Sequence, residues 1–191
     1  MQRNRIAIFA LSSLAWIAAA IAQPRAIDTT KSVMTVHVYK GGAFSAFGHN
    51  HEISAPIRSG SADITGHHVE LTVEASALRV RDTDASEKDR AEIQKTMLGP
   101  AVLDTERYRE IVFRSTAAEP AGTGAWNVSG ALTLHGQTKT VAVRVSEKAG
   151  HYIGQVALKQ TDFGMKPVKV GGGAVKVKDE IRIEFDIQLA R

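Results

Sequence analysis

The feature that most constrains this chain is an almost unbroken alternation of apolar and polar residues in its last third. The apolar members of the closing run share one parity, and they are Ile181, Ile183, Phe185, Ile187 and Leu189. Charged or polar residues occupy every position between them. Successive side chains of a β-strand point to opposite faces of a sheet, so such a run has one dry face and one wet face. The alternation predicts an antiparallel β protein whose function depends on what its apolar face encloses.

Residues 1–22 have the features of a cleaved secretory signal peptide. Arg3 and Arg5 supply a positive end, an apolar stretch follows over residues 6–21, and small residues surround Ala22 as at a cleavage site. An uncleaved membrane anchor is the alternative, because the stretch approaches the length of a spanning helix. The Ala-x-Ala ending favours removal. We therefore expect an exported protein that is cleaved after Ala22, with a single mature domain over residues 23–191.

The charge balance argues against nucleic acid as a partner. The chain carries 24 Lys and Arg against 20 Asp and Glu, a net charge of +4, and residues 1–22 contain two arginines and no acid, so their removal leaves +2. The remaining charges are interleaved rather than clustered. Transient contact with a membrane surface and the oligomeric state are left open. One cluster is interpreted as a solvated strand edge, with an anion site as the alternative, and it comprises Lys166, Lys169, Lys176 and Lys178.

Alternating runs separated by turn residues predict a single antiparallel β-barrel of about eight strands, because closure leaves no exposed strand edges. A helix is predicted over residues 85–98, with Asp84 and Glu87 as its capping pair and Gly99-Pro100 as its end. Its apolar stripe is thin, so we expect it to lie across the barrel surface or a mouth. The predicted strands span residues 32–39, 49–57, 61–65, 67–77, 111–113, 126–134, 139–145, 152–158 and 177–189.

Few residues point to catalysis. The chain has no cysteine, no G-x-S-x-G elbow and no H-E-x-x-H motif, so we expect neither an enzyme nor a cofactor. His49 and His51 share one side of a predicted strand, a spacing that can seat two imidazoles on one metal. No third ligand has a supporting spacing, so a polar pair lining a cavity is the favoured interpretation. A metal-binding or redox accessory protein using both histidines is the alternative.

Aromatic residues and small inward positions indicate a ligand cavity. Inward residues such as Gly130 and Gly154 leave room inside a barrel of about eight strands, which either fills with side chains or holds a ligand. An ordinary filled core, in an interaction module without a ligand, is the other possibility. The aromatic residues proposed to line an apolar tunnel are Phe44, Phe47, Phe113, Phe163 and Phe185.

Several motifs make the chain resemble the YceI-like proteins, which are periplasmic barrels of lipocalin-like shape associated with polyisoprenoid binding. The most specific is the run Leu132-Thr133-Leu134-His135-Gly136-Gln137-Thr138-Lys139, and others are Leu103-Asp104 with Arg107-Tyr108, Gln160-Thr161-Asp162-Phe163-Gly164 and Lys178-Asp179-Glu180. Two segments depart from the family pattern where a mouth or lid is expected, namely Phe47-Gly48-His49-Asn50-His51-Glu52 and Thr96-Met97-Leu98-Gly99-Pro100.

The resemblance implies a periplasmic carrier whose lipocalin-like barrel encloses a long isoprenoid lipid, such as a polyprenyl phosphate or a quinone. Burial of the apolar tail supplies the affinity, at about 25 cal/mol per Å² of surface. His49, His51 and the lysines are the candidates for head-group contact. The full set of predicted ligand-binding residues is Phe44, Phe47, His49, His51, Leu71, Val73, Ile111, Phe113, Leu132, Leu134, Phe163 and Phe185.

Overall fold

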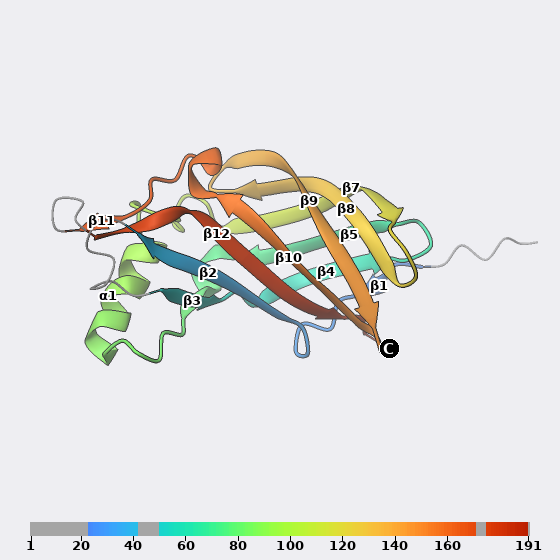
Figure 1. Ribbon diagram of the computed structural model, residues 1–191, viewed down its shortest axis with the longest axis horizontal. Coiled ribbons are helices and arrows are strands. Elements are labelled where there is room, and N and C mark those ends of the chain that lie inside the picture. The colour runs from blue at the N-terminus through green and yellow to red at the C-terminus, as the bar shows by residue number, and fades with distance from the viewer. Residues whose placement is uncertain (1–22, 42–49, 171–174, 191) are drawn as a thin grey trace, which may run out of the picture.

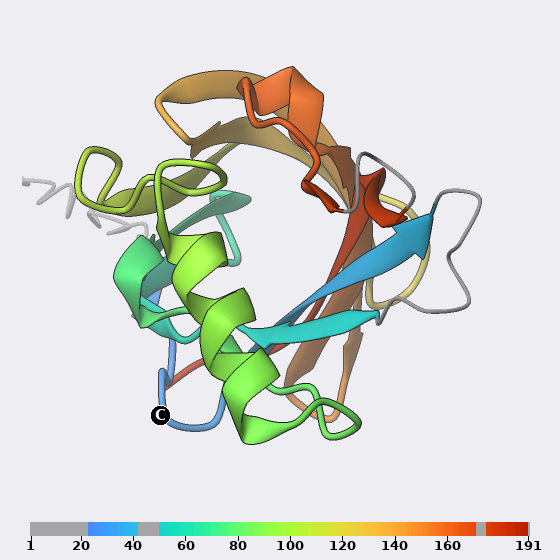
Figure 2. The same cartoon turned by 90° about the vertical axis from the view of Figure 1, so that its left-hand side faces the viewer.

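The computed structural model describes residues 23–41, 50–170 and 175–190. These residues form one antiparallel sheet of twelve strands that curls around a lumen, with helix α1 (Glu87–Leu98) at one end (Figures 1 and 2). The strands are β1 (Arg25–Ala26), β2 (Val33–Gly41), β3 (His51–Ser54), β4 (Ile57–Asp63), β5 (His68–Glu74), β6 (Arg79–Val80), β7 (Glu110–Pro120), β8 (Ala125–Leu134), β9 (Gln137–Lys148), β10 (His151–Lys159), β11 (Lys169–Val170) and β12 (Val175–Gln188).

The order of hydrogen-bonded neighbours is β1-β4-β5-β7-β8-β9-β10-β12-β2-β3-β6, and β11 pairs separately with β12. At one end of the barrel the sheet closes, because the residue after β1 contacts both β4 and the segment that follows β12. Ile27 bridges Leu189 just beyond β12, and the Ile27 amide donates to the Gly60 carbonyl of β4 at 2.9 Å. The predicted closure therefore occurs at this end, whereas towards α1 the hydrogen-bonded ladder ends at β6.

The count of twelve strands exceeds the predicted eight because two long strands are each divided in two and because the two-residue β6 and β11 add two more. A turn over residues 28–32 separates β1 from β2, and Pro56 interrupts the run that holds β3 and β4. Proline has no N–H to donate to a ladder, so a strand breaks there. When these pairs are joined and the two-residue β6 and β11 are set aside, eight long strands remain among the described residues. The prediction of an antiparallel, barrel-shaped β fold is confirmed.

Helix α1 lies across the mouth of the barrel, as Figure 2 shows in the view from that end. Its predicted capping pair is wrong by two residues. The N-cap is Ser86, whose hydroxyl accepts from the Asp89 amide at 3.1 Å, so the same four-residue spacing is satisfied later in the chain. Gly99 ends the helix as predicted, with its amide donating to the Lys95 carbonyl at 3.0 Å. Met97, which belongs to α1, is the buried residue of the helix.

The helix also covers the strand at which the ladder ends. The Gln94 side chain accepts from the Val80 amide and donates to the Leu78 carbonyl, both at 2.8 Å. One amide side chain thus makes the two backbone hydrogen bonds that a neighbouring strand would make. An uncovered edge strand is a template for aggregation, so this contact protects the sheet. No helix within the described ranges is both long and apolar enough to cross a membrane.

Candidate ligand-binding lumen

A cavity of about 250 Å³ runs inside the barrel. The inner faces of the long strands line it, together with Met97 of α1 and the segment at Val102 and Leu103 that follows the helix. Nearly all lining side chains are apolar or aromatic, and the polar ones are Asp63, His67 and Gln160. A cavity with such a wall offers no hydrogen-bonding partner along most of its length, so it favours an apolar occupant over water.

Strand alternation produces this wall directly. Every apolar residue of the closing run, from Ile181 to Leu189, lines the cavity, whereas the exposed Arg182 and Glu184 between them do not. Several inward residues, including Ile183 and Phe185, are only partly buried although they face the interior. Their remaining exposed surface belongs to the lumen. The interior is therefore not completely filled by the protein's own side chains.

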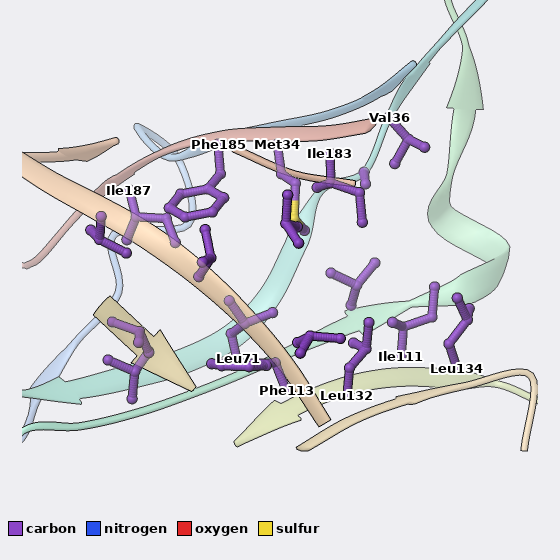
Figure 3. Close-up of a pocket in the computed structure, with 18 of the residues that line it drawn as sticks. Met34, Val36, Leu71, Ile111, Phe113, Leu132, Leu134, Ile183, Phe185 and Ile187 are labelled. Carbon is purple, nitrogen blue, oxygen red and sulfur yellow. The ribbon is translucent and has the colours of Figure 1, made fainter. Parts of the chain in front are cut away.

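Seven of the predicted ligand-binding residues line this cavity, and their inward orientation is confirmed. Figure 3 shows six of them converging on the lumen from both walls. Their contact with a ligand stays a prediction. The seven residues are Leu71, Val73, Ile111, Phe113, Leu132, Leu134 and Phe185.

The other five predicted residues are placed differently. Phe163 is 1% exposed and packs in the hydrophobic core outside the cavity lining, where its carbonyl accepts from His135 Nδ1 at 3.1 Å. His51 is also absent from the lining. Phe44, Phe47 and His49 lie outside the described residues.

His51 is engaged in a polar contact beside α1. Its Nδ1 lies 2.6 Å from Asp82 Oδ2, and Asp82 Oδ1 accepts from the Glu52 amide at 2.8 Å. The Asp82 side chain has no exposed surface. Within the ranges that the structure describes, no group of three or more potential metal ligands occurs. The predicted roles of His51 in head-group or metal binding remain predictions.

The polar lining residues lie at the two ends of the lumen. Asp63 and His67 flank the turn between β4 and β5, far from α1, whereas Gln160 follows β10 on the α1 side (Figure 1). Gln160 is 5% exposed, and its Nε2 donates to the Lys178 carbonyl at 2.8 Å. The adjacent Thr161 donates its hydroxyl to Asp179 at 2.7 Å, and this bond lowers the pKa of the Asp179 carboxyl. Two side-chain contacts thus fix this turn against β12.

The inward glycines do not leave open space, contrary to the sequence-based expectation. A Cβ atom at Gly154 would lie 2.5 Å from Phe185 Cζ, and one at Gly130 would lie 2.5 Å from Phe113 Cζ. Each phenyl ring therefore covers a glycine on a neighbouring strand. The glycines allow the rings to lie close to the wall. The space inside the barrel therefore results from the position of the rings and not from empty space at the glycines.

The sequence-based site also omitted several lining residues. Met34 and Val36 share the inward parity of the first long strand, and Trp126 and Tyr152 share that of β8 and β10. Parity was sufficient to find all four of these residues. Gln160 continues the inward parity of β10 one position beyond the end of the strand, but its polar side chain gives no apolar signal.

Comparison with known proteins agrees with this architecture. The chain is 33% identical over 116 residues to a UPF0312 protein of Vibrio campbellii, covering 55% of this chain and 59% of that relative. The chain thus matches under two thirds of that relative's length. A Burkholderia cenocepacia structure, BcnA, superposes with a TM-score of 0.60 at 19% identity, covering 86% of this chain and 99% of the other.

A second solved structure has the same fold. It is described as a polyisoprenoid binding domain from Saccharophagus degradans, and it superposes with a TM-score of 0.59 at 14% identity, covering 86% of this chain and 96% of the other. The YceI-like domain matches residues 26–189, which is almost the whole described part of the chain. The protein therefore belongs to the YceI-like family.

Proposed function

We propose that this protein is a periplasmic carrier or reservoir that encloses a long isoprenoid lipid of the polyprenyl phosphate or isoprenoid quinone type. The observation that carries the proposal is the apolar lumen, whose polar side chains, among the residues that the structure describes, lie at its ends. Burying one isoprene unit there stabilises the complex by more than about 1 kcal/mol, so a long tail binds without polar contacts along its length. The related Saccharophagus domain, described as polyisoprenoid binding, supports the same ligand class.

Binding rather than catalysis is the activity that this geometry favours. At the centre of the lumen the described wall residues are apolar, so they hold a chain by buried area and present no nucleophile or base there. The head group is proposed to lie at the α1 end, near Gln160 and His51, and His49 remains a sequence-based candidate for the same contact. Since His51 Nδ1 faces Asp82, its Nε2 is the atom left for such a contact.

Export is the second part of the proposal. Residues 1–22 are proposed to act as a signal peptide that is removed in the periplasm. The intact mass of protein purified from a native host tests this directly. A chain that begins at Gln23 supports it, and a chain that retains Trp16 and fractionates with membranes contradicts it.

Mass spectrometry of an organic extract tests ligand binding. The purified protein is expected to release an isoprenoid. The variant Ile183→Trp is expected to release none, because the larger side chain fills the lumen. Arg182→Trp is the matched control, because the neighbouring side chain is exposed on the outer face. Bound metal without lipid would favour the metal-binding alternative instead. Release of neither would indicate a filled barrel that serves as an interaction module.

A further inference from the structure

Two rows of cross-strand neighbours face each other across the lumen. In one row Phe185 of β12 pairs with Gly154 of β10 on one side and with Met34 of β2 on the other. In the other row Leu71 of β5 pairs with Phe113 of β7. The four large side chains all line the cavity, and Figure 3 shows that the two rows come from opposite walls.

These side chains lie where two hydrophobic clusters meet. One cluster includes Met97 beneath α1, and the other includes Ile27 at the end where the sheet closes. Met34 and Leu71 pack against both clusters, whereas Phe113 packs against the first and Phe185 against the second. The two rows therefore lie between the α1 half and the β1 half of the one continuous lumen.

The position of the two phenyl rings depends on glycine. Phe185 covers Gly154 and Phe113 covers Gly130, at separations that leave no space for a Cβ atom. Any larger residue at these glycines would force the ring or the strand to move. The rings are therefore held near the wall, and the cavity continues between the two rows.

We propose that Met34, Leu71, Phe113 and Phe185 form a waist that determines which chains the lumen accepts. The waist admits one slender, methyl-branched chain from one half of the lumen into the other, and it rejects fused-ring lipids. A volume of about 250 Å³ is below the range of about 300–1,000 Å³ that is common for ligand pockets, which is consistent with a narrow occupant. The inference rests on the proposed function, and it names the residues that set chain girth and length.

The test measures dissociation constants of the mature protein for geraniol, farnesol and geranylgeraniol, which differ by one isoprene unit each. In the unmodified protein, affinity is expected to rise by about tenfold per unit as more of the chain is buried. Leu71→Phe narrows the waist, so geranylgeraniol is expected to bind no more tightly than farnesol. Phe185→Leu widens the waist, and this variant is expected to bind cholesterol at least about tenfold more tightly than the unmodified protein does.

Phe163→Leu is the matched control, because it shortens a buried aromatic side chain that lies outside the cavity lining. It is expected to lower stability and leave both selectivities unchanged. The waist is overturned if Leu71→Phe keeps the full gain in affinity for each added isoprene unit. It is also overturned if Phe185→Leu binds cholesterol no more tightly than the unmodified protein does. Unmodified protein that binds no isoprenoid alcohol overturns the proposed function instead. In that case, the waist is tested by measuring how affinity changes with length for straight-chain alcohols in the unmodified protein and in Leu71→Phe. If neither series of alcohols binds, both the waist and the proposed function are wrong.

Discussion

The wall of the barrel and its α1 end are stabilised in different ways. Along the wall, from β7 to β12, long paired strands satisfy the backbone while every second side chain faces the lumen. At the α1 end the ladder ends, and individual side chains replace a strand. Gln94 bonds to the backbone of β6, Asp82 joins His51 to the Glu52 amide, and Arg90 donates to the Asp82 carbonyl at 2.9 Å. Periodicity therefore specifies the wall, whereas particular polar contacts specify the mouth.

A charge placed on the inner face of the wall is expected to have the largest effect. Leu132 is 8% exposed and lines the lumen, so Leu132→Asp buries a carboxylate without a partner. We expect a loss of about 3–5 kcal/mol in the free energy of unfolding. Denaturant titration followed by tryptophan fluorescence measures this.

The matched control places the same residue on the outer face of the same strand. Ala131 is half-buried on the outer face, opposite Arg114 in the β7–β8 ladder, and we expect Ala131→Asp to change stability by less than about 0.5 kcal/mol. Equal losses for the two variants would mean that both faces of this strand are sensitive. The distinction between a dry and a wet face of β8 would then be wrong.

Removing the central polar contact of the α1 end is expected to have the next largest effect. Asp82→Ala leaves the Glu52 amide and His51 without their common acceptor at a site that is only 3% exposed. Hydrogen bonds to a buried charged group support a loss of about 2–3 kcal/mol. In Asp82→Ala, amide hydrogen exchange should accelerate, relative to the unmodified protein, more in β3 and α1 than in β8. Uniform acceleration over all strands would contradict the separation of mouth from wall.

The wall was predictable from sequence because its physical cause is local and repeated. The parity of Leu132 and Leu134, or of Ile183 and Phe185, follows from the strand geometry alone. The end of the helix at Gly99 was equally clear. The inward orientation of the seven predicted residues that line the cavity required no knowledge of their partners.

The mouth was not predictable by the same reasoning. Asp82 and His51 are 31 positions apart, and nothing in the spacing of Gln94 indicates that its amide bonds to β6. The division of the first long strand depends on Asp28, whose side chain accepts from the Thr30 and Lys31 amides within a single turn. Contacts of this kind occur once, so no period reveals them. The phenyl rings over Gly130 and Gly154 likewise became visible only with the strand register.

Acid is expected to weaken the turn that separates β1 from β2. The Thr30 hydroxyl and the Lys31 side chain beside Asp28 lower the pKa of that carboxyl from 3.8 to about 2. A lowered pKa means that this contribution to stability is complete above about pH 4 and is lost as the pH falls through 2. Thermal unfolding between pH 5 and pH 2 measures it, and Asp28→Asn should flatten this part of the profile. An identical profile in the variant would assign acid sensitivity to other carboxylates.

The smallest effect is expected for the ion pair on the outer face of the wall. Arg114 Nε lies 3.1 Å from Glu70 Oε2 across the β5–β7 ladder, and the two side chains are 59% and 46% exposed. Solvent screens such a pair, so a double-mutant cycle with Arg114→Ala and Glu70→Ala should give a coupling energy below about 0.5 kcal/mol. The coupling should fall further in 1 M salt, where the screening length is about 3 Å. A coupling above about 1 kcal/mol would show that outer-face pairs stabilise the wall appreciably, and inward alternation would no longer suffice to explain its stability.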